Sequence, residues 1–301
     1  MTSQKSKSTS KKIQNIVIAL ILGFIALIFL MPTVLTIANS FMTSSEINAN
    51  YGAMIDNMTD SDDKEFISER LNLKFIPDKV TFSQYNSVLF KNSNYLLKFW
   101  NSVIMVVPIT LFQLLTAVFA SYGFARSRGK LKEVIFFFYI ILMLMPYQVT
   151  LVPNFLVADK FGLLNTRWSV ILPGIFSPFS VFLLTKIMKR IPSSYIEAAK
   201  LDGASEWQIL FHVCLPLCKG ALFSVGLLVF IDYWNMVDQP LIMLKDADMQ
   251  PLSVFLSEIN KGDIGLAFAV GVIYMVPSLL LFLYGEDYLI EGITYSGGIK
   301  G

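Results

Sequence analysis

Long stretches of uncharged, mostly apolar residues alternate with polar segments along the chain. Each stretch is about long enough to cross the roughly 30 Å hydrocarbon layer of a membrane as a helix. One further stretch is interrupted by Asp232, and we interpret it as a span that carries a single ionisable group. We therefore predict an all-α polytopic membrane protein with six transmembrane helices, within Ile13 to Ser45, Phe99 to Ala125, Val134 to Ala158, Trp168 to Thr185, Lys219 to Asp238 and Ile264 to Gly285.

Basic residues near the span ends predict the orientation, because Lys and Arg close to a span tend to remain in the cytoplasm. Lys5, Lys7, Lys11 and Lys12 precede the first span, and a basic connection, residues 126–132, follows the second. The segment from Glu46 to Asp78 is acidic on balance, as expected outside the cell. The C-terminal segment is also acidic, but acids contribute little to this rule. Both the N and C termini are predicted to be cytoplasmic.

This topology divides the chain into segments of different character. They are a cytoplasmic basic tail (1–12), the first transmembrane helix (13–40), an extracellular segment with an acidic insert around Asp56 to Arg70 (41–97), a transmembrane domain of five helices (98–285) and a cytoplasmic glycine-rich tail (286–301). Hydrophobic residues make up 54% of the chain and charged residues 15%, with a mean hydropathy of +0.59. That composition indicates a multi-pass protein of the cell membrane, in contact with lipid, and the net charge of +2 gives no reason to expect a nucleic-acid partner.

Residues that carry out chemistry are scarce. Cys214, Cys218 and His212 are too few for a zinc site or a catalytic constellation, so we predict no catalytic residues and no metal. The nearest approach to a phosphate-binding loop is Gly129-Lys130, which lacks the preceding glycine and the following Ser or Thr. The chain is therefore predicted to hold no cofactor, and any ATP must be bound by another chain.

The predicted inside connection from Ile191 to Pro216 contains two helix starts. Ser194 with Glu197, and Ser205 with Gln208, have the spacing of a capping box, in which each side chain bonds the other residue's amide. Between them, Gly203 suits the left-handed residue that ends a helix. The segment therefore predicts a helix, a tight turn and a second helix.

Two features of this hairpin indicate a docking surface for another protein. Its first helix carries small residues, Ala198 and Ala199, and its second an apolar stripe, Trp207, Leu210 and Phe211. Pro216 is expected to stop the second helix. The same pattern also permits an amphipathic hairpin that lies on the inner leaflet.

A resemblance separates these alternatives. Glu197-Ala198-Ala199, followed by Asp202-Gly203-Ala204 and Val213-Cys214-Leu215-Pro216, resembles the EAA signature of ABC importer permeases. Nearly the whole chain resembles the smaller, MalG-like permease of maltose-type carbohydrate importers. In that family the usual isoleucine stands where this chain has Val213, which is a mild departure.

The resemblance implies a type I ABC importer permease fold and a function in importing a sugar or oligosaccharide. It implies a coupling loop, residues 191–216, that contacts the ATPase through Glu197, Ala198, Ala199, Asp202, Gly203, Ala204, Trp207, Leu215 and Pro216. It also implies four kinds of partner: a second, larger permease, an ATPase dimer that binds ATP and Mg²⁺, an extracellular sugar-binding protein, and lipid.

Two further sets of residues are predicted to meet the substrate or its carrier. Asp232, Tyr233, Trp234 and Asn235 are expected to line the passage, because a carboxylate, an amide and flat aromatic rings suit sugars. Alternatively, Trp234 packs between helices and a donor of the partner permease holds Asp232. The connection from Leu244 to Pro251 is expected to contact the binding protein through Lys245, Asp246, Asp248 and Gln250.

Other functions remain open at this point. The buried carboxylate of Asp232 would also serve a proton-coupled secondary transporter. An ABC permease for a solute other than sugar fits the same pattern. A membrane enzyme would need paired carboxylates or a metal cluster, which the sequence does not offer.

Overall fold

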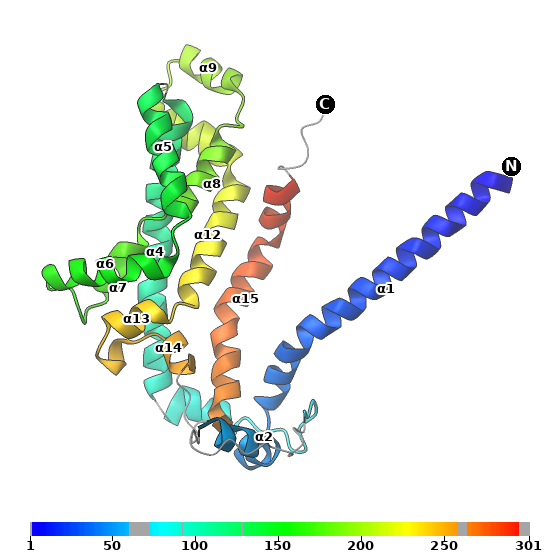
Figure 1. Ribbon diagram of the computed structural model, residues 1–301. Coiled ribbons are helices and arrows are strands. Elements are labelled where there is room, and N and C mark those ends of the chain that lie inside the picture. Colours follow the sequence, from blue (N-terminus) through cyan, green and yellow to red (C-terminus); the bar gives the residue numbers. More distant parts are fainter. Residues whose placement is uncertain (1, 60–72, 92, 128, 258–263, 295–301) are drawn as a thin grey trace. The chain divides into compact units, whose positions relative to one another are not determined.

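A computed structural model describes residues 2–59, 73–91, 93–127, 129–257 and 264–294, and every regular element in these ranges is a helix (Figure 1). The all-α prediction is thereby confirmed. Most of the predicted acidic insert and the last residues of the glycine-rich tail lie outside the described residues. The chain forms two units, which we call unit 1 (Met1–Ser93 with Ile259–Ile273) and unit 2 (Asn94–Glu258 with Tyr274–Gly301).

Unit 1 contains the first long apolar helix and the polar segment that follows it. Its elements are α1 (Thr2–Asn39), α2 (Ser44–Thr59), α3 (Ser83–Asn86), the π-helix η1 (Ser87–Lys91) and the first part of α15 (Ile264–Thr294). The side chains from Gln14 to Val34 are all exposed, although most are apolar, which suits a helix that faces lipid. A small core forms where α1 ends: Met42, Ile47 and Tyr51 are buried, and the Tyr51 ring packs 5.6 Å from that of Phe268.

A charged cluster joins α2 to the segment before α3. The Glu46 carboxylate accepts a hydrogen bond from the Asp78 amide at 2.8 Å and lies 3.0 Å from the Lys74 ammonium, which also pairs with the Asp78 carboxylate. The Asp78 amide and the Lys74 ammonium hold the pKa of Glu46 below its ordinary value, and the two carboxylates raise the pKa of Lys74. The cluster therefore depends on all three charges.

Unit 2 is built around one long helix, α4 (Ser93–Arg126). The other elements of unit 2 are α5 (Lys130–Met143), α6 (Tyr147–Lys160), α7 (Trp168–Gly174), α8 (Pro178–Met188), α9 (Ser193–Leu201), α10 (Glu206–Ile209), the π-helix η2 (Leu210–Cys214), α11 (Leu215–Leu217), α12 (Lys219–Trp234), α13 (Asp238–Met243), the 3-10 helix η3 (Ala247–Met249), α14 (Leu252–Ser257) and the rest of α15.

The described helices include four that are long and apolar enough to cross a membrane, Gln14–Asn39, Asn94–Arg126, Trp168–Met188 and Leu266–Tyr288. Two pairs of helices also qualify when each is taken together: Lys130–Met143 with Tyr147–Lys160, and Glu206–Leu217 with Lys219–Trp234. The pairs are bent by 101° and 78°. By length and composition, the described residues thus contain between four and six helices or bent pairs that could cross a membrane.

The span predicted within Val134 to Ala158 is a bent pair of helices and not one straight helix. α5 ends at Met143, and α6 begins at Tyr147 after the 101° bend. Pro146 occupies the N-cap of α6 with φ −59° and ψ 138°. Its ring removes a backbone donor and disfavours helical geometry at the preceding residue, so the first helix stops and a second starts in a new direction.

Two groups of buried side chains stabilise unit 2, one toward each end of α4. The first group joins the hairpin segment to α4, α8 and α12, and it includes Val118, Leu184, Met188, Ile196, Ile209, Cys214 and Val225. The second joins α4 to α7 and α13, and it includes Met105, Ile109, Val170, Ile171 and Met243. Both ends of α4 are therefore held in packed surroundings, and each supports one of the surfaces described next.

Candidate functional site

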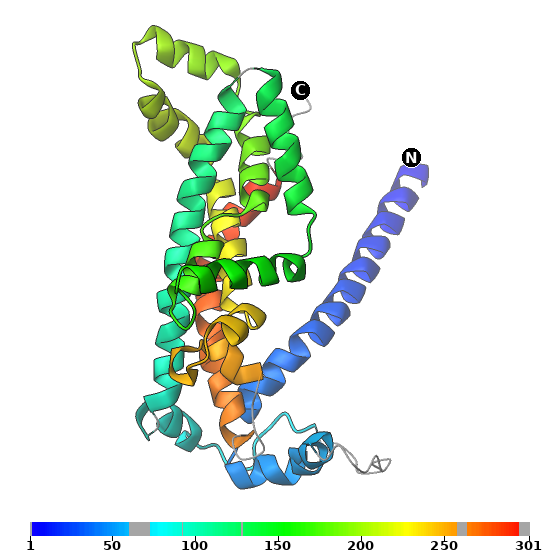
Figure 2. The same cartoon turned by 60° about the vertical axis from the view of Figure 1, so that its left-hand side comes forward.

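The connection between α8 and α12 forms the predicted helical hairpin (Figures 1 and 2). Gly203 has φ +80°, in the left-handed region. Its amide donates to the Lys200 carbonyl at 3.1 Å, and the Ala204 amide donates to the Ala199 carbonyl at 2.9 Å. These two bonds form a Schellman motif, which satisfies carbonyls at the end of α9. The tight turn predicted at Gly203 is thereby confirmed.

The second helix of the hairpin starts with the capping box predicted for it. The Gln208 amide donates to the Ser205 hydroxyl at 3.4 Å, and the Ser205 amide donates to the Gln208 side-chain oxygen at 2.8 Å. Two amides that lack a partner within the helix are thus satisfied reciprocally. Together, the Schellman motif and the capping box fix the chain direction on both sides of the turn.

The capping box predicted at Ser194 and Glu197 is wrong. α9 begins at Ser193, two residues earlier than a cap at Ser194 would give, and Pro192 takes the N-cap position without any side-chain cap. Proline fixes φ near the −56° observed here and tolerates the extended ψ of a cap, so the helix starts directly after it. Ser194 is therefore already inside the helix. The carboxylate of the exposed Glu197 makes no hydrogen bond or ion pair within the part of the chain that the structure describes.

Pro216 does not stop the second helix, contrary to the prediction. α10 continues through the π-helical turn η2 into α11, and Pro216 lies within α11. Pro216 directly follows η2, and this π-helical turn already interrupts the regular i→i−4 hydrogen bonds where the proline lacks its amide donor. The helical direction changes only at Cys218, where the 78° bend separates this segment from α12.

The surface of the hairpin combines small, charged and apolar side chains. Ala198 is exposed beside Glu197, and Leu201, next to the turn, is 90% exposed. Trp207 is 61% exposed and stacks on Phe211 at 6.3 Å, while Leu210 is buried. The predicted apolar stripe is thus divided, with Leu210 packed inward and the aromatic pair on the surface.

The hairpin is fastened to one end of α4. The Tyr122 hydroxyl donates a hydrogen bond to the Glu206 carboxylate, which also pairs with Lys200 at 2.7 Å. The Phe119 ring packs edge-on against Trp207 at 5.6 Å. A displacement of the hairpin would therefore act directly on α4.

The predicted passage residues separate into two kinds. Trp234 is 1% exposed, donates its indole N–H to the Tyr274 carbonyl at 3.0 Å and stacks on Phe230 at 5.3 Å. A side chain this deeply buried packs helices together and cannot line a passage. The prediction that Trp234 lines the passage is therefore wrong. Asp232 and Asn235 are exposed, and Tyr233 is partly so. The Asp232 carboxylate makes no hydrogen bond or ion pair with any described residue.

At the other end of α4, polar side chains hold the connection from Leu244 to Pro251. Lys98, Asn101 and Ser102 are all buried. Lys98 donates to the Ala247 carbonyl at 2.7 Å, and Ser102 accepts from the Leu252 amide at 3.0 Å. The sequence analysis missed this role, although the spacing i, i+3, i+4 places the three polar residues on one face of an apolar helix.

Asn101 makes the central contacts of this arrangement. Its amide nitrogen donates to the carbonyls of Asp248 and Gln250, at 2.6 and 3.1 Å, and its oxygen accepts from Arg167 at 2.8 Å. The side chains predicted to face the binding protein remain available at the surface: Lys245, Asp246 and Asp248 are exposed, and Gln250 is partly so. The connection is thus braced through its backbone while its charged side chains point outward.

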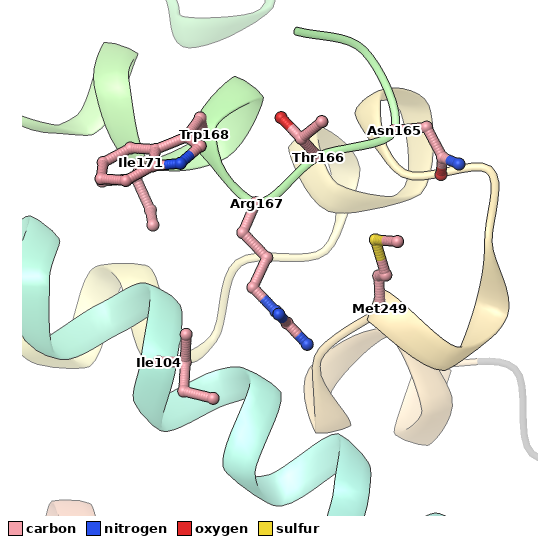
Figure 3. A pocket seen from close by; sticks show the side chains of 7 residues that line it. All are labelled: Ile104, Asn165, Thr166, Arg167, Trp168, Ile171 and Met249. Carbon is pink, nitrogen blue, oxygen red and sulfur yellow. The ribbon is translucent and has the colours of Figure 1, made fainter.

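A cavity of about 380 Å³ lies beside this connection (Figure 3). In Figure 3 the Arg167 side chain extends into the space between Ile104 of α4 and the segment that carries Met249. Asn165, at φ +57°, starts the turn that leads to Arg167, and its side-chain oxygen accepts from the Asp246 amide at 2.9 Å. The cavity is lined by Ile104, Asn165, Thr166, Arg167, Trp168, Ile171 and Met249.

Known proteins resemble this chain over most of its length. It is 30% identical over 284 residues to the arabinooligosaccharides transport system permease protein AraQ of Halalkalibacterium halodurans, covering 93% of this chain and 94% of that protein. It is 29% identical over 234 residues to the lactose transport system permease protein LacG of Rhizobium radiobacter, covering 75% and 85%.

The fold also has a counterpart among solved structures. A chain of a bacterial ABC transporter involved in the import of the acidic polysaccharide alginate superposes with a TM-score of 0.76 at 23% identity, over 93% of this chain and 98% of that one. Residues 113–289, which include the hairpin and the braced connection, match the family described as binding-protein-dependent transport system inner membrane component. The chain therefore belongs to that family of multi-pass permeases of ABC transport systems, which are transport components and not catalytic subunits.

Proposed function

We propose that this protein is the permease subunit of an ABC importer that carries a sugar or oligosaccharide across the plasma membrane. The proposal is supported by the relatives, whose names assign arabinooligosaccharides and lactose to permeases of similar length. Family membership favours it over a proton-coupled secondary transporter. An ABC permease for another solute is the remaining alternative, and the substrate test below separates the two.

The topology proposed with this function has six spans and cytoplasmic N and C termini. The bent pair Lys130–Met143 with Tyr147–Lys160 then counts as one span, and the fifth span starts at Lys219, after the hairpin. The basic connection around Lys130 and the hairpin then fall on the cytoplasmic side. The segments retain their proposed bounds: 1–12 and 286–301 cytoplasmic, 13–40 the first span, 41–97 extracellular and 98–285 the five-helix domain. The 101° bend after Met143 is compatible with a span whose break lies in protein or along a watery path.

The hairpin is the observation on which the proposal chiefly rests. It is an exposed helix–turn–helix whose turn is fixed by hydrogen bonds, and it is attached to α4, so it combines an open surface with a rigid connection to the spans. We assign it to docking an ATPase dimer that binds ATP and Mg²⁺. The residues assigned to this contact are Glu197, Ala198, Ala199, Asp202, Gly203, Ala204 and Trp207, with Leu215 and Pro216 at the base.

The remaining partners are a second, larger permease and an extracellular sugar-binding protein. The passage would form between the two permeases, with Asp232, Tyr233 and Asn235 of this chain facing it. The braced connection, with Lys245, Asp246, Asp248 and Gln250, would contact the binding protein. Its backbone is held in place before a partner arrives, which lowers the entropy that docking would otherwise cost.

Reconstitution tests the function. The chain is co-expressed with the neighbouring transport genes, purified and placed in vesicles, and uptake of the sugar found in the isolated binding protein is followed with and without ATP. Uptake that requires ATP, the co-purified ATPase and the binding protein, and that vanadate blocks, is the expected result. Uptake driven by a proton gradient alone, or a binding protein that carries a non-sugar ligand, would overturn the proposal.

A further inference from the structure

The cavity beside the braced connection has one polar and one apolar side. Its lining divides into Asn165, Thr166 and Arg167, which carry polar groups, and Ile104, Trp168, Ile171 and Met249, which are mostly apolar. A volume of about 380 Å³ is within the range of roughly 300–1,000 Å³ usual for small-molecule sites. A lining with a large apolar area and a few convergent polar groups is also typical of such sites.

Arg167 brings to the cavity a guanidinium group that forms no ion pair with any described residue. No carboxylate lies within 4.0 Å of it among these residues, and one of its terminal nitrogens donates to Asn101 at 2.8 Å. Its Nε is buried and has no hydrogen-bond partner in the described part of the chain. A guanidinium presents its donors as a planar fork that matches a carboxylate, and the bond to Asn101 holds that fork in one orientation.

The other lining residues match the remaining surface of a sugar. Asn165 uses its side-chain oxygen for the Asp246 amide, which leaves its NH₂ group to donate. Thr166 donates its hydroxyl to the Leu163 carbonyl at 2.6 Å, so its oxygen can still accept. Trp168 lines the cavity and is 54% exposed, and an indole face packs well on the C–H face of a sugar ring.

We propose that this cavity, beside the braced connection, binds a uronate residue, that is, a sugar unit with a carboxylate. The carboxylate pairs with Arg167, hydroxyl groups meet Asn165 and Thr166, and the ring lies against Trp168. A neutral sugar would leave the guanidinium without an anionic partner, so the site discriminates in favour of the charged sugar. The inference rests on the proposed function in sugar import and adds the substrate class.

The full chain in lipid nanodiscs tests the inference, because the cavity is formed within unit 2 alone. Calorimetry compares a galacturonate trisaccharide with the neutral galactose trisaccharide. We expect at least about tenfold tighter binding of the charged sugar, weakened by added salt.

Arg167→Gln should remove the preference and Arg167→Lys should retain part of it. Trp168→Ala should weaken binding of the charged sugar. Trp100→Ala is the matched control, because Trp100 is also 54% exposed but lies outside the cavity, and it should change nothing.

If the wild-type protein binds the two sugars with equal affinity, or does not bind the galacturonate trisaccharide, the inference is overturned. A preference that survives Arg167→Gln would also overturn it. If Arg167→Gln does not fold, the inference is still tested by the affinities of the wild-type protein for the two sugars and by the affinity of Trp168→Ala for the charged sugar. ATP-dependent uptake of a neutral sugar by a complex whose permease binds no uronate would refute this inference and leave the proposed function standing.

Discussion

The side-chain nitrogen of Asn101 lies 2.6 Å from the main-chain oxygen of Asp248, although 147 residues separate them in sequence. This bond attaches the connection before α14 to one end of α4, and the hairpin is attached to the other end through Tyr122 and Glu206. α4 has 34 residues, about 51 Å at about 1.5 Å per residue. One helix thus joins the proposed ATPase-docking surface to the proposed binding-protein surface.

Asn101→Ala should loosen the braced connection. The change removes both donated hydrogen bonds to part-buried carbonyls, and two such bonds together contribute roughly 1–3 kcal/mol. Opening of the segment should become about 5 to 150 times more frequent. Hydrogen exchange at the Met249 and Gln250 amides measures it. Leu97→Ala, at an exposed position of the same helix, is the control, and unchanged protection in Asn101→Ala would contradict the bracing role.

Gly203→Ala should destabilise the hairpin through backbone strain alone. A Cβ added to Gly203 would meet no atom within 4 Å, but φ is +80°, so the left-handed conformation costs roughly 1–2 kcal/mol. Gly203→Asn should cost less, because asparagine tolerates this conformation better. The thermal midpoint of the purified chain is measured. Gly123→Ala, equally open but helical in α4, should not lower the midpoint, and equal loss in both variants would argue against strain.

Glu197→Gln tests whether the Glu197 carboxylate contacts the ATPase, because this carboxylate does not cap α9. Glu197 is exposed and makes no hydrogen bond or ion pair within the described residues, so the helix should survive the change. If the carboxylate pairs with a basic residue of the ATPase, affinity for the ATPase should fall about tenfold or more. Co-purification and circular dichroism provide the two readouts. Glu133→Gln on α5 serves as an exposed control, and full assembly of Glu197→Gln would count against the ion pair.

The charged cluster of unit 1 should show a defined pH window. The pKa of Glu46 is lowered in the folded chain, so its stabilisation exists above its unfolded pKa and is lost as pH falls through the folded value. The pKa of Lys74 is raised, so its contribution is lost only as pH rises through its folded value, in the alkaline range. Glu46→Gln should therefore lower the thermal midpoint at pH 7, and the difference from wild type should shrink as pH falls through the folded pKa of Glu46. A difference independent of pH would refute the assignment.

Much of the fold follows from local patterns in the sequence. The Schellman turn at Gly203 and the capping box at Ser205 depend on neighbouring residues, so their predictions were confirmed. Pro192 and Pro146 show the limit of such patterns. Pro192, and not Ser194, occupies the N-cap of α9. Pro146 occupies the N-cap of α6 and so divides an apolar stretch into two helices. Apolar composition identifies a stretch as membrane-embedded but does not distinguish a straight span from a bent one.

The parts of the site that depend on distant contacts could not be predicted. Trp234 has the same chemistry whether it faces sugar or packs between helices, and only the positions of Tyr274 and Phe230 decide the matter. Asn101 and Arg167 belong to different connections, so no local spacing reveals that one orients the other. A single chain also lacks the partner surfaces, which is why the roles assigned to Glu197 and Asp232 remain proposals.

The central claim is that the hairpin transmits ATP-driven motion from the ATPase to the spans, and the most direct test is Ala198→Trp in the reconstituted complex. Ala198 is exposed on α9, so the chain should still fold, but an indole there would hold the partner surface away. ATP hydrolysis and sugar uptake are measured on the same vesicles, with Val80→Trp in unit 1 as an exposed control. Uptake at least about tenfold below wild type is the expected result. Wild-type uptake by an Ala198→Trp complex that contains the full amount of ATPase would contradict it.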